Sequence, residues 1–188
     1  MRLGVTPNTI TIAGFVGSLG AAALIIERYW IAAGFVYVAA SLLDSLDGAV
    51  ARESGRASAF GAFFDSTLDR FAEGVVLGAI GVTLAQDDLP VAVGACFVAL
   101  TGSFLVSYTR ARAEGLGVTS NKGGLMSRPE RIFLTSVGIF FAPINHVLEV
   151  VVYVLAALTV LTVLQRIDHV RRALAEPGTE PDKEKSAP

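Results

Sequence analysis

Long uncharged runs separated by short polar segments dominate the chain. A helix needs about 20 consecutive apolar residues to cross the hydrocarbon core of a membrane. The pattern predicts six such helices, within residues 3–26 and at about 30–50, 60–85, 89–109, 132–141 and 150–164. The fifth is short, because Pro143 and Asn145 indicate a turn directly after it. We therefore expect an all-α, polytopic membrane protein with six transmembrane helices.

Composition supports a membrane domain and limits the possible partners. Hydrophobic residues make up 53% of the 188 residues and the mean hydropathy is +0.59, values typical of an integral membrane protein. From Ala173 the chain is polar and Pro-rich, so we expect one membrane domain over residues 1–172 and a disordered cytoplasmic tail over 173–188. The single Cys96 excludes an intrachain disulfide. The net charge of −2 argues against nucleic acid as a partner.

The distribution of basic residues predicts the orientation. If both termini are cytoplasmic, the outer loops contain residues 27–28, 86–88 and the turn at Pro143. Arg28 is then the only one of the 15 Lys and Arg residues on the outside. Cytoplasmic loops are enriched in Lys and Arg. We therefore expect a multi-pass protein of the cell membrane with both termini in the cytoplasm.

Four aspartates lie within 26 residues of this apolar chain: Asp44, Asp47, Asp65 and Asp69. Their i,i+3 and i,i+4 spacings place each pair on one face of a helix. Four carboxylates gathered in a site of low dielectric cannot all stay ionised without a counter-charge. Mg²⁺ and Mn²⁺ prefer oxygen ligands of this kind. The pattern predicts a divalent metal site near the cytoplasmic interface, and acids that are merely salt-bridged or face a cavity are the alternative.

These aspartates belong to a longer pattern, D-x-x-D-G-x-x-A-R followed by G-x-x-x-D-x-x-x-D. It resembles the signature of the CDP-alcohol phosphatidyltransferases, and all eight defining positions are present: Asp44, Asp47, Gly48, Ala51, Arg52, Gly61, Asp65 and Asp69. The resemblance implies a transferase that takes the phosphatidyl group from CDP-diacylglycerol and releases CMP. It also implies that the four aspartates hold Mg²⁺ or Mn²⁺, that Asp69 acts as general base, and that the enzyme is a homodimer.

Residues around the aspartates are candidates for binding the CDP-lipid. Gly48 and Gly61 lack side chains where cytidine or a neighbouring helix must come close, and Arg52 can pair with the diphosphate. The predicted helix start at Pro7, Asn8, Thr9 and Ile10 directs backbone N–H groups towards an anion, and Ser58 offers a hydroxyl. The resemblance assigns both regions to the CDP-lipid. As plain helix caps they would look the same.

Five arginines lie at the ends of three predicted helices, at the cytoplasmic mouth of the bundle: Arg110, Arg112, Arg128, Arg131 and Arg166. Arginine suits bidentate recognition of phosphate, so we expect an acceptor that carries a phosphate, although positive-inside anchoring would also place arginines here. Their segments resemble those of bacterial phosphatidylinositol phosphate synthases, which usually have Lys at the position of Arg110. The resemblance implies inositol 1-phosphate as the acceptor.

Two other functional assignments fit parts of the pattern. Glycerol 3-phosphate is an alternative acceptor, because it also carries a phosphate that the arginines could bind; the enzyme would then make phosphatidylglycerol phosphate. A cation transporter would be a different class, but its ion-binding acids would favour broken helices near the bilayer midplane. At the depth of Arg70 and Glu73 charges are expensive, so we expect these two to pair with each other or with an arginine of a neighbouring helix.

Overall fold

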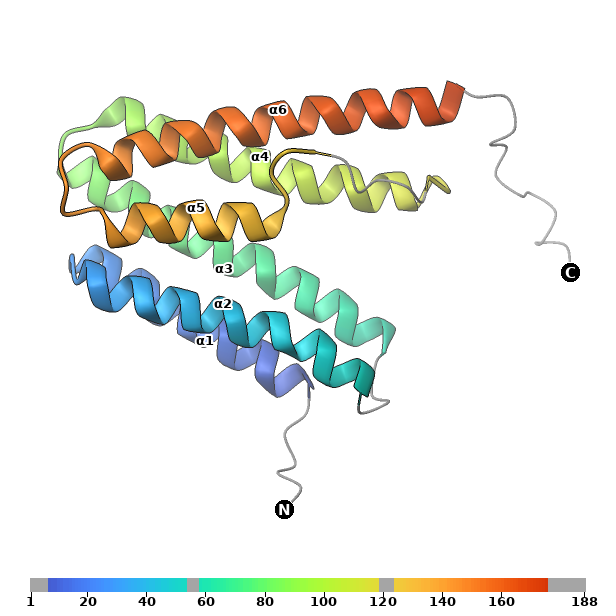
Figure 1. Cartoon of the computed structure of the whole chain (residues 1–188), viewed down its shortest axis with the longest axis horizontal. Helices are drawn as coiled ribbons and strands as arrows, with labels where there is room; N and C mark the ends of the chain where they lie inside the picture. Colours follow the sequence, from blue (N-terminus) through green and yellow to red (C-terminus); the bar gives the residue numbers. More distant parts are fainter. Residues whose placement is uncertain (1–6, 54–57, 119–123, 176–188) are drawn as a thin grey trace, which may run out of the picture.

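The computed structural model describes residues 7–53, 58–118 and 124–175, without the side chains of Pro7 and of residues 46–53. This part of the chain forms six α-helices and no strand (Figure 1). They are α1 (Pro7–Ile26), α2 (Trp30–Glu53), α3 (Ala59–Gln86), α4 (Pro90–Glu114), α5 (Arg128–Phe140) and α6 (Val147–Ala175). The predicted all-α class is confirmed. The predictions for the side chains of Pro7, Asp47, Gly48 and Arg52 fall outside the described residues.

Three of the helices are long and apolar enough to cross a membrane: α1 from Asn8, α4 and α6. In α2 the apolar part is the shorter stretch Trp30–Ser45, and α5 has only 13 residues. The helix α6 continues to Ala175, beyond the boundary at 172 expected from composition.

Local sequence explains where several helices begin and turn. Ser58 caps α3 by accepting a hydrogen bond from the Gly61 N–H at 3.0 Å, which satisfies one of the unpaired donors of the first turn. The α1–α2 and α3–α4 turns each pass through one residue with positive φ, Arg28 at 62° and Asp88 at 55°. These short turns make the helices that they join antiparallel neighbours.

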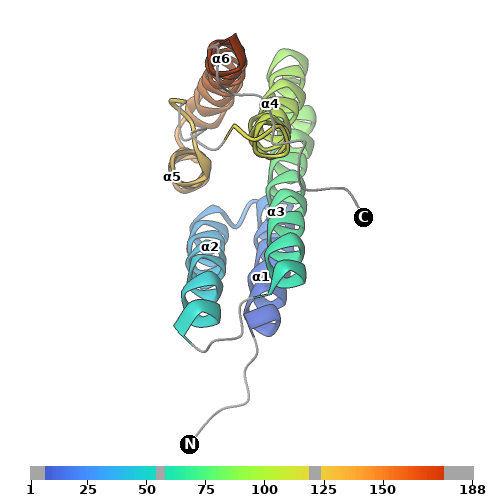
Figure 2. The ribbon, with the colours of Figure 1, turned by 90° about the vertical axis from the view of Figure 1, so that its right-hand side faces the viewer.

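The six helices pack as two groups of three. Figure 2 shows α1, α2 and α3 in the lower part and α4, α5 and α6 in the upper part, with α3 reaching α4 and α2 reaching α5. Glycines allow the closest contacts: a Cβ built on Gly17 would lie 2.8 Å from the Ala40 Cβ of α2. The buried core includes Ile25, Ile80 and Ile139. The start of α1 and the end of α6 lie at the same end of the bundle (Figure 1).

Candidate active site

Three of the four predicted metal ligands come together between α2 and α3. Carboxylate oxygens of Asp44, Asp65 and Asp69 all lie within 4.8 Å of one another. Asp44 is buried, with 8% of its side chain exposed, and Asp69 is 12% exposed. The two helices are brought together by α1, which packs against both. The structure therefore gathers the carboxylates that the spacing of the aspartates predicted for one site.

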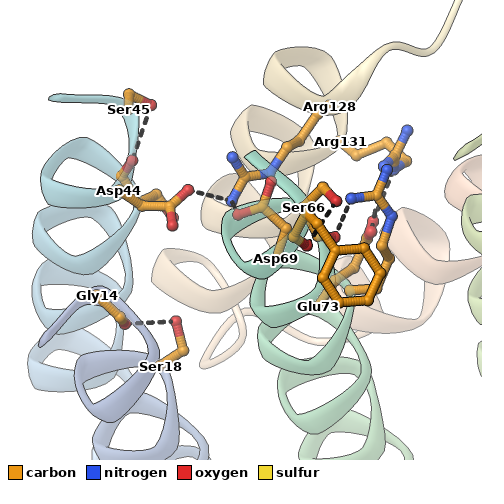
Figure 3. Close-up of polar contacts among 12 residues, drawn as sticks. Gly14, Ser18, Asp44, Ser45, Ser66, Asp69, Glu73, Arg128 and Arg131 are labelled. Carbon is orange, nitrogen blue, oxygen red and sulfur yellow. Dashed lines mark hydrogen bonds and ion pairs between the residues drawn. The ribbon is translucent and has the colours of Figure 1, made fainter. Parts of the chain in front are cut away.

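Arg128, the first residue of α5, provides the positive charge beside these carboxylates (Figure 3). Its guanidinium forms an ion pair with Asp44 and another with Asp69, the latter at 2.5 Å. The Asp69 Oδ1 atom nevertheless accepts no aligned hydrogen bond within the described part of the chain. A buried carboxylate oxygen in this condition is suited to a cation. The donor set is oxygen only, which fits Mg²⁺ or Mn²⁺.

A cavity of about 480 Å³ opens beside Asp69. Four of the five predicted arginines line it, namely Arg110, Arg128, Arg131 and Arg166. Arg112 is exposed and does not line this cavity. Hydroxyls and further charges complete the wall, from Ser66, Arg70, Glu73, Ser107, Glu114 and Ser127. The cavity therefore combines a cluster of positive charge with groups that can bind hydroxyls.

The buried Arg131 is paired with Glu73 of α3. Two hydrogen bonds join them, from Nε at 2.6 Å and from Nη2 at 3.1 Å, and only 4% of Arg131 is exposed. This confirms that Glu73 pairs with an arginine of a neighbouring helix. Arg70 instead donates to the backbone oxygen of Ser66, one turn earlier in α3.

Side chains of α6 hold the segment that leads into α5. The Leu125 N–H donates to the Gln165 side-chain oxygen at 3.2 Å, and the Met126 N–H donates to the Thr162 hydroxyl at 3.0 Å. Sequence reasoning did not assign Thr162 to the site. Its signal was weak, because it is one hydroxyl inside an apolar helix.

Two further contacts complete this region. Arg166 donates to the Val106 backbone oxygen of α4 at 2.5 Å. At the start of α5, the Ser127 hydroxyl donates to the Glu130 carboxylate. These contacts fix the direction in which α5 enters the bundle, and with it the positions of Arg128 and Arg131.

The predicted CDP-lipid residues of α1 and α3 lie together. A Cβ built on Gly61 would be 3.1 Å from the Ser58 hydroxyl oxygen and 3.6 Å from the Asn8 side-chain oxygen. Thr9 is exposed and Ile10 is partly buried. Ser58 does cap its helix, but this cap uses the hydroxyl only as an acceptor, so its O–H group can still donate to a ligand.

An apolar groove of about 710 Å³ runs between α2 and α5. Leu42, Phe133 and Phe140 are among the residues that line it, and Arg128 lies in its wall too. Sequence reasoning did not predict this groove, because it depends on how α5 packs against α2. Its lining would suit a hydrocarbon chain.

Comparison with known proteins agrees with this geometry. The sequence model of the CDP-alcohol phosphatidyltransferases matches residues 4–165, which include the four aspartates of the motif. The chain belongs to this family. The predicted family and the predicted transferase class are therefore confirmed.

Relatives from archaea and bacteria align with this chain over most of its length. The archaetidylinositol phosphate synthase of Pyrococcus horikoshii is 37% identical over 173 residues, which are 92% of this chain and 87% of the relative. The phosphatidylinositol phosphate synthase of Mycolicibacterium smegmatis is 38% identical over 181 residues, or 91% and 80% of the two chains.

Solved structures of the phosphatidylinositol phosphate synthase of Mycobacterium tuberculosis have the same fold. One, in complex with manganese and citrate, has a TM-score of 0.84 and 34% identity and covers 96% of this chain and 88% of its own. Another, with CDP-diacylglycerol bound, has a TM-score of 0.82 and 32% identity and covers 96% and 92%.

Proposed function

We propose that this transferase moves the phosphatidyl group of CDP-diacylglycerol to inositol 1-phosphate, giving phosphatidylinositol phosphate and CMP. The observation that carries the proposal is that Asp69 belongs to two neighbouring features. One is the aspartate cluster of Asp44, Asp65 and Asp69, and the other is the arginine cavity, the cavity of about 480 Å³ lined by Arg110, Arg128, Arg131 and Arg166. A carboxylate in this position can meet both substrates. The names of the two relatives and of the M. tuberculosis enzyme support inositol phosphate as the acceptor.

The aspartates have two tasks in this reaction. Asp44, Asp65 and Asp69, with Asp47 as the fourth member of the motif, would hold Mg²⁺ or Mn²⁺, which neutralises the diphosphate of the CDP-lipid. Asp69 takes the proton from the acceptor hydroxyl. That oxygen then forms a bond to the phosphorus of the phosphatidyl group while the bond from this phosphorus to the CMP oxygen breaks.

The remaining site residues bind and orient the two substrates. The CDP moiety is bound by Arg52, Gly48, Gly61, Ser58 and the start of α1. The groove between α2 and α5 receives an acyl chain. The acceptor phosphate carries nearly two negative charges and several acceptor oxygens. It is surrounded by Arg110, Arg128, Arg131 and Arg166. Arg112 stands apart from the cavity and serves as an inner-face anchor.

We place all six helices across the cell membrane, with both termini and the active site at the cytoplasmic face. The support is the position of Arg28 as the lone outer cation together with the common end of the bundle at which α1 begins and α6 ends. There, water-soluble inositol phosphate reaches the arginine cavity. We also propose a homodimer, on the resemblance to the family alone.

Glycerol 3-phosphate is the second candidate acceptor, because the same arginines would bind its phosphate. The wall of hydroxyls and carboxylates favours the larger polyol, since it offers partners for several hydroxyl groups. A cation transporter has no support from the family match.

The test measures kcat/KM for purified protein with labelled CDP-diacylglycerol and one acceptor at a time. Inositol 1-phosphate should exceed glycerol 3-phosphate, and EDTA or Asp44→Asn should abolish turnover. Arg110→Ala should raise the acceptor KM roughly 10- to 100-fold, the usual effect of losing one charge-assisted contact. The matched control Arg112→Ala should change it little. Faster reaction with free inositol or serine would refute the phosphate cavity, whereas faster reaction with glycerol 3-phosphate would overturn only the inositol assignment.

A further inference from the structure

Arg128 belongs to two sites at once. Its guanidinium contacts Asp44 and Asp69, and the same side chain lines the arginine cavity beside Ser127 and Arg131. It is 34% exposed, unlike Arg131 at 4%. Two other arginines of the cavity wall have different partners, because Arg110 pairs with Glu114 and Arg131 pairs with Glu73.

The two possible counter-charges of the cluster exclude each other. The oxygens of Asp44 and Asp69 that Arg128 contacts belong to the group of carboxylates that could hold a divalent cation. A guanidinium and a divalent cation cannot both occupy such closely spaced oxygens without strong repulsion. The acceptor phosphate needs the same guanidinium on the other side. Arg128 stands at the start of α5, so a rotation of its long side chain changes its partner without moving the helix.

We propose that Arg128 couples the metal site to the acceptor site by exchanging between the two carboxylates and the acceptor phosphate. With Arg128 turned towards the phosphate, the carboxylates are free for the cation. Each ligand therefore favours the same position of the side chain. By linkage, each must then strengthen the binding of the other by one common factor. This inference rests on the proposed function, because it needs both a metal site and a phosphorylated acceptor.

The first experiment measures the Kd of Mn²⁺ by titration calorimetry on the purified full-length protein, without CDP-lipid. Arg128→Ala should bind Mn²⁺ roughly tenfold or more tightly than wild type, because a competing charge-assisted contact is gone. Arg110→Ala is the matched control: it removes one positive charge from the same cavity, but Arg110 pairs with Glu114 and not with the cluster. Its Mn²⁺ affinity should stay within about threefold of wild type.

The second experiment repeats the titration with saturating inositol 1-phosphate. The wild-type Kd for Mn²⁺ should fall about tenfold, within the usual range of coupling between sites, and the fall should be clearly smaller in Arg128→Ala. Arg128→Lys keeps the charge but cannot bridge two carboxylates with a planar fork, so it should resemble the Ala variant. Arg128→Gln provides the same comparison if the Ala variant does not elute as a folded, helical protein.

Different results separate this inference from the function on which it rests. If Arg128→Ala leaves the Mn²⁺ affinity unchanged, weakens it, or strengthens it no more than Arg110→Ala, the exchange is refuted while the metal site stands. Equal coupling in wild type and in Arg128→Ala has the same meaning. If the wild-type protein binds no Mn²⁺, both proposals are wrong.

Discussion

At the scale of single residues, the site is governed by charges that are paired across helices. Glu73 of α3 and Arg131 of α5 form two hydrogen bonds in a region where Arg131 is almost fully buried. Ionised groups taken out of water are tolerated only when their partners replace the lost solvation. The pair therefore fixes the distance between α3 and the first turns of α5. It also keeps Arg131 in the wall of the arginine cavity.

Removing one member of this pair should be costly. We expect Glu73→Gln to lower the free energy of unfolding by about 3–5 kcal/mol, because Arg131 is left as an uncompensated buried charge. Glu114→Gln is the control, since Glu114 pairs with Arg110 in an exposed i,i+4 contact at 2.9 Å and should cost less than about 1 kcal/mol. Chemical denaturation in detergent, followed by circular dichroism, measures both. Equal effects of the two substitutions would contradict a structural role for the buried pair.

At the scale of elements, close contact between α4 and α6 supports the acceptor side of the site. Gly102 of α4 faces Thr159 of α6, and a Cβ built on the glycine would lie 2.7 Å from the Thr159 Cβ. Thr159 is fully buried and its hydroxyl donates to the backbone of its own helix. About one and two turns further along α6, Thr162 and Gln165 hold the segment before α5. The approach of α4 to α6 thus affects how α5 is placed.

Gly102→Ala should therefore destabilise the protein by roughly 1–3 kcal/mol, the usual cost of overpacking a well-filled contact. Gly94 lies in the same helix with nothing within 4 Å of an added Cβ. Gly94→Ala should instead be neutral or stabilise by up to about 1 kcal/mol, because alanine is the better helix former. Thermal unfolding of the two variants in one detergent checks the difference. A Gly102→Ala protein as stable as Gly94→Ala would show that α4 and α6 do not approach so closely.

At the scale of the whole molecule, the chemistry is confined to one part of an otherwise apolar bundle. The aspartate cluster and the arginine cavity share Asp69 and Arg128. The turns at Arg28 and Asp88, which we propose lie on the outer side, carry few charges, and Arg28 is paired with Asp87 at 2.6 Å. In a membrane this asymmetry would direct the site to the cytoplasm.

The proposed orientation can be tested with single cysteines in a Cys96→Ala background. Asp88→Cys lies at the α3–α4 turn and Ala59→Cys at the start of α3, both at exposed positions. An impermeant maleimide should label Asp88→Cys in intact cells, and Ala59→Cys only after permeabilisation. The Cys96→Ala protein alone is the unlabelled control. Labelling of both positions in intact cells would overturn the topology and the cytoplasmic active site with it.

Local sequence patterns were enough to predict the helices, the family and the chemical character of the site. Six apolar stretches predicted six helices, and the spacing of Asp65 and Asp69 predicted their shared face, because helix periodicity is a local property of the backbone. The Ser58 cap is local for the same reason. The motif of aspartates, glycines and arginine indicates a metal-dependent transferase without reference to any contact between helices.

Which side chains meet depends instead on how the helices pack against one another. Arg128 pairs with Asp44 and Asp69, which are distant from it in sequence. The hydrogen bond from the Met126 N–H to Thr162 likewise joins distant residues. They depend on the rotation of each helix about its axis and on the helices beside it. Arg110 and Arg112 show this limit: both ended the same predicted span, yet only Arg110 lines the cavity. Residues two apart on a helix point to nearly opposite sides, and packing alone determined which side the cavity occupies.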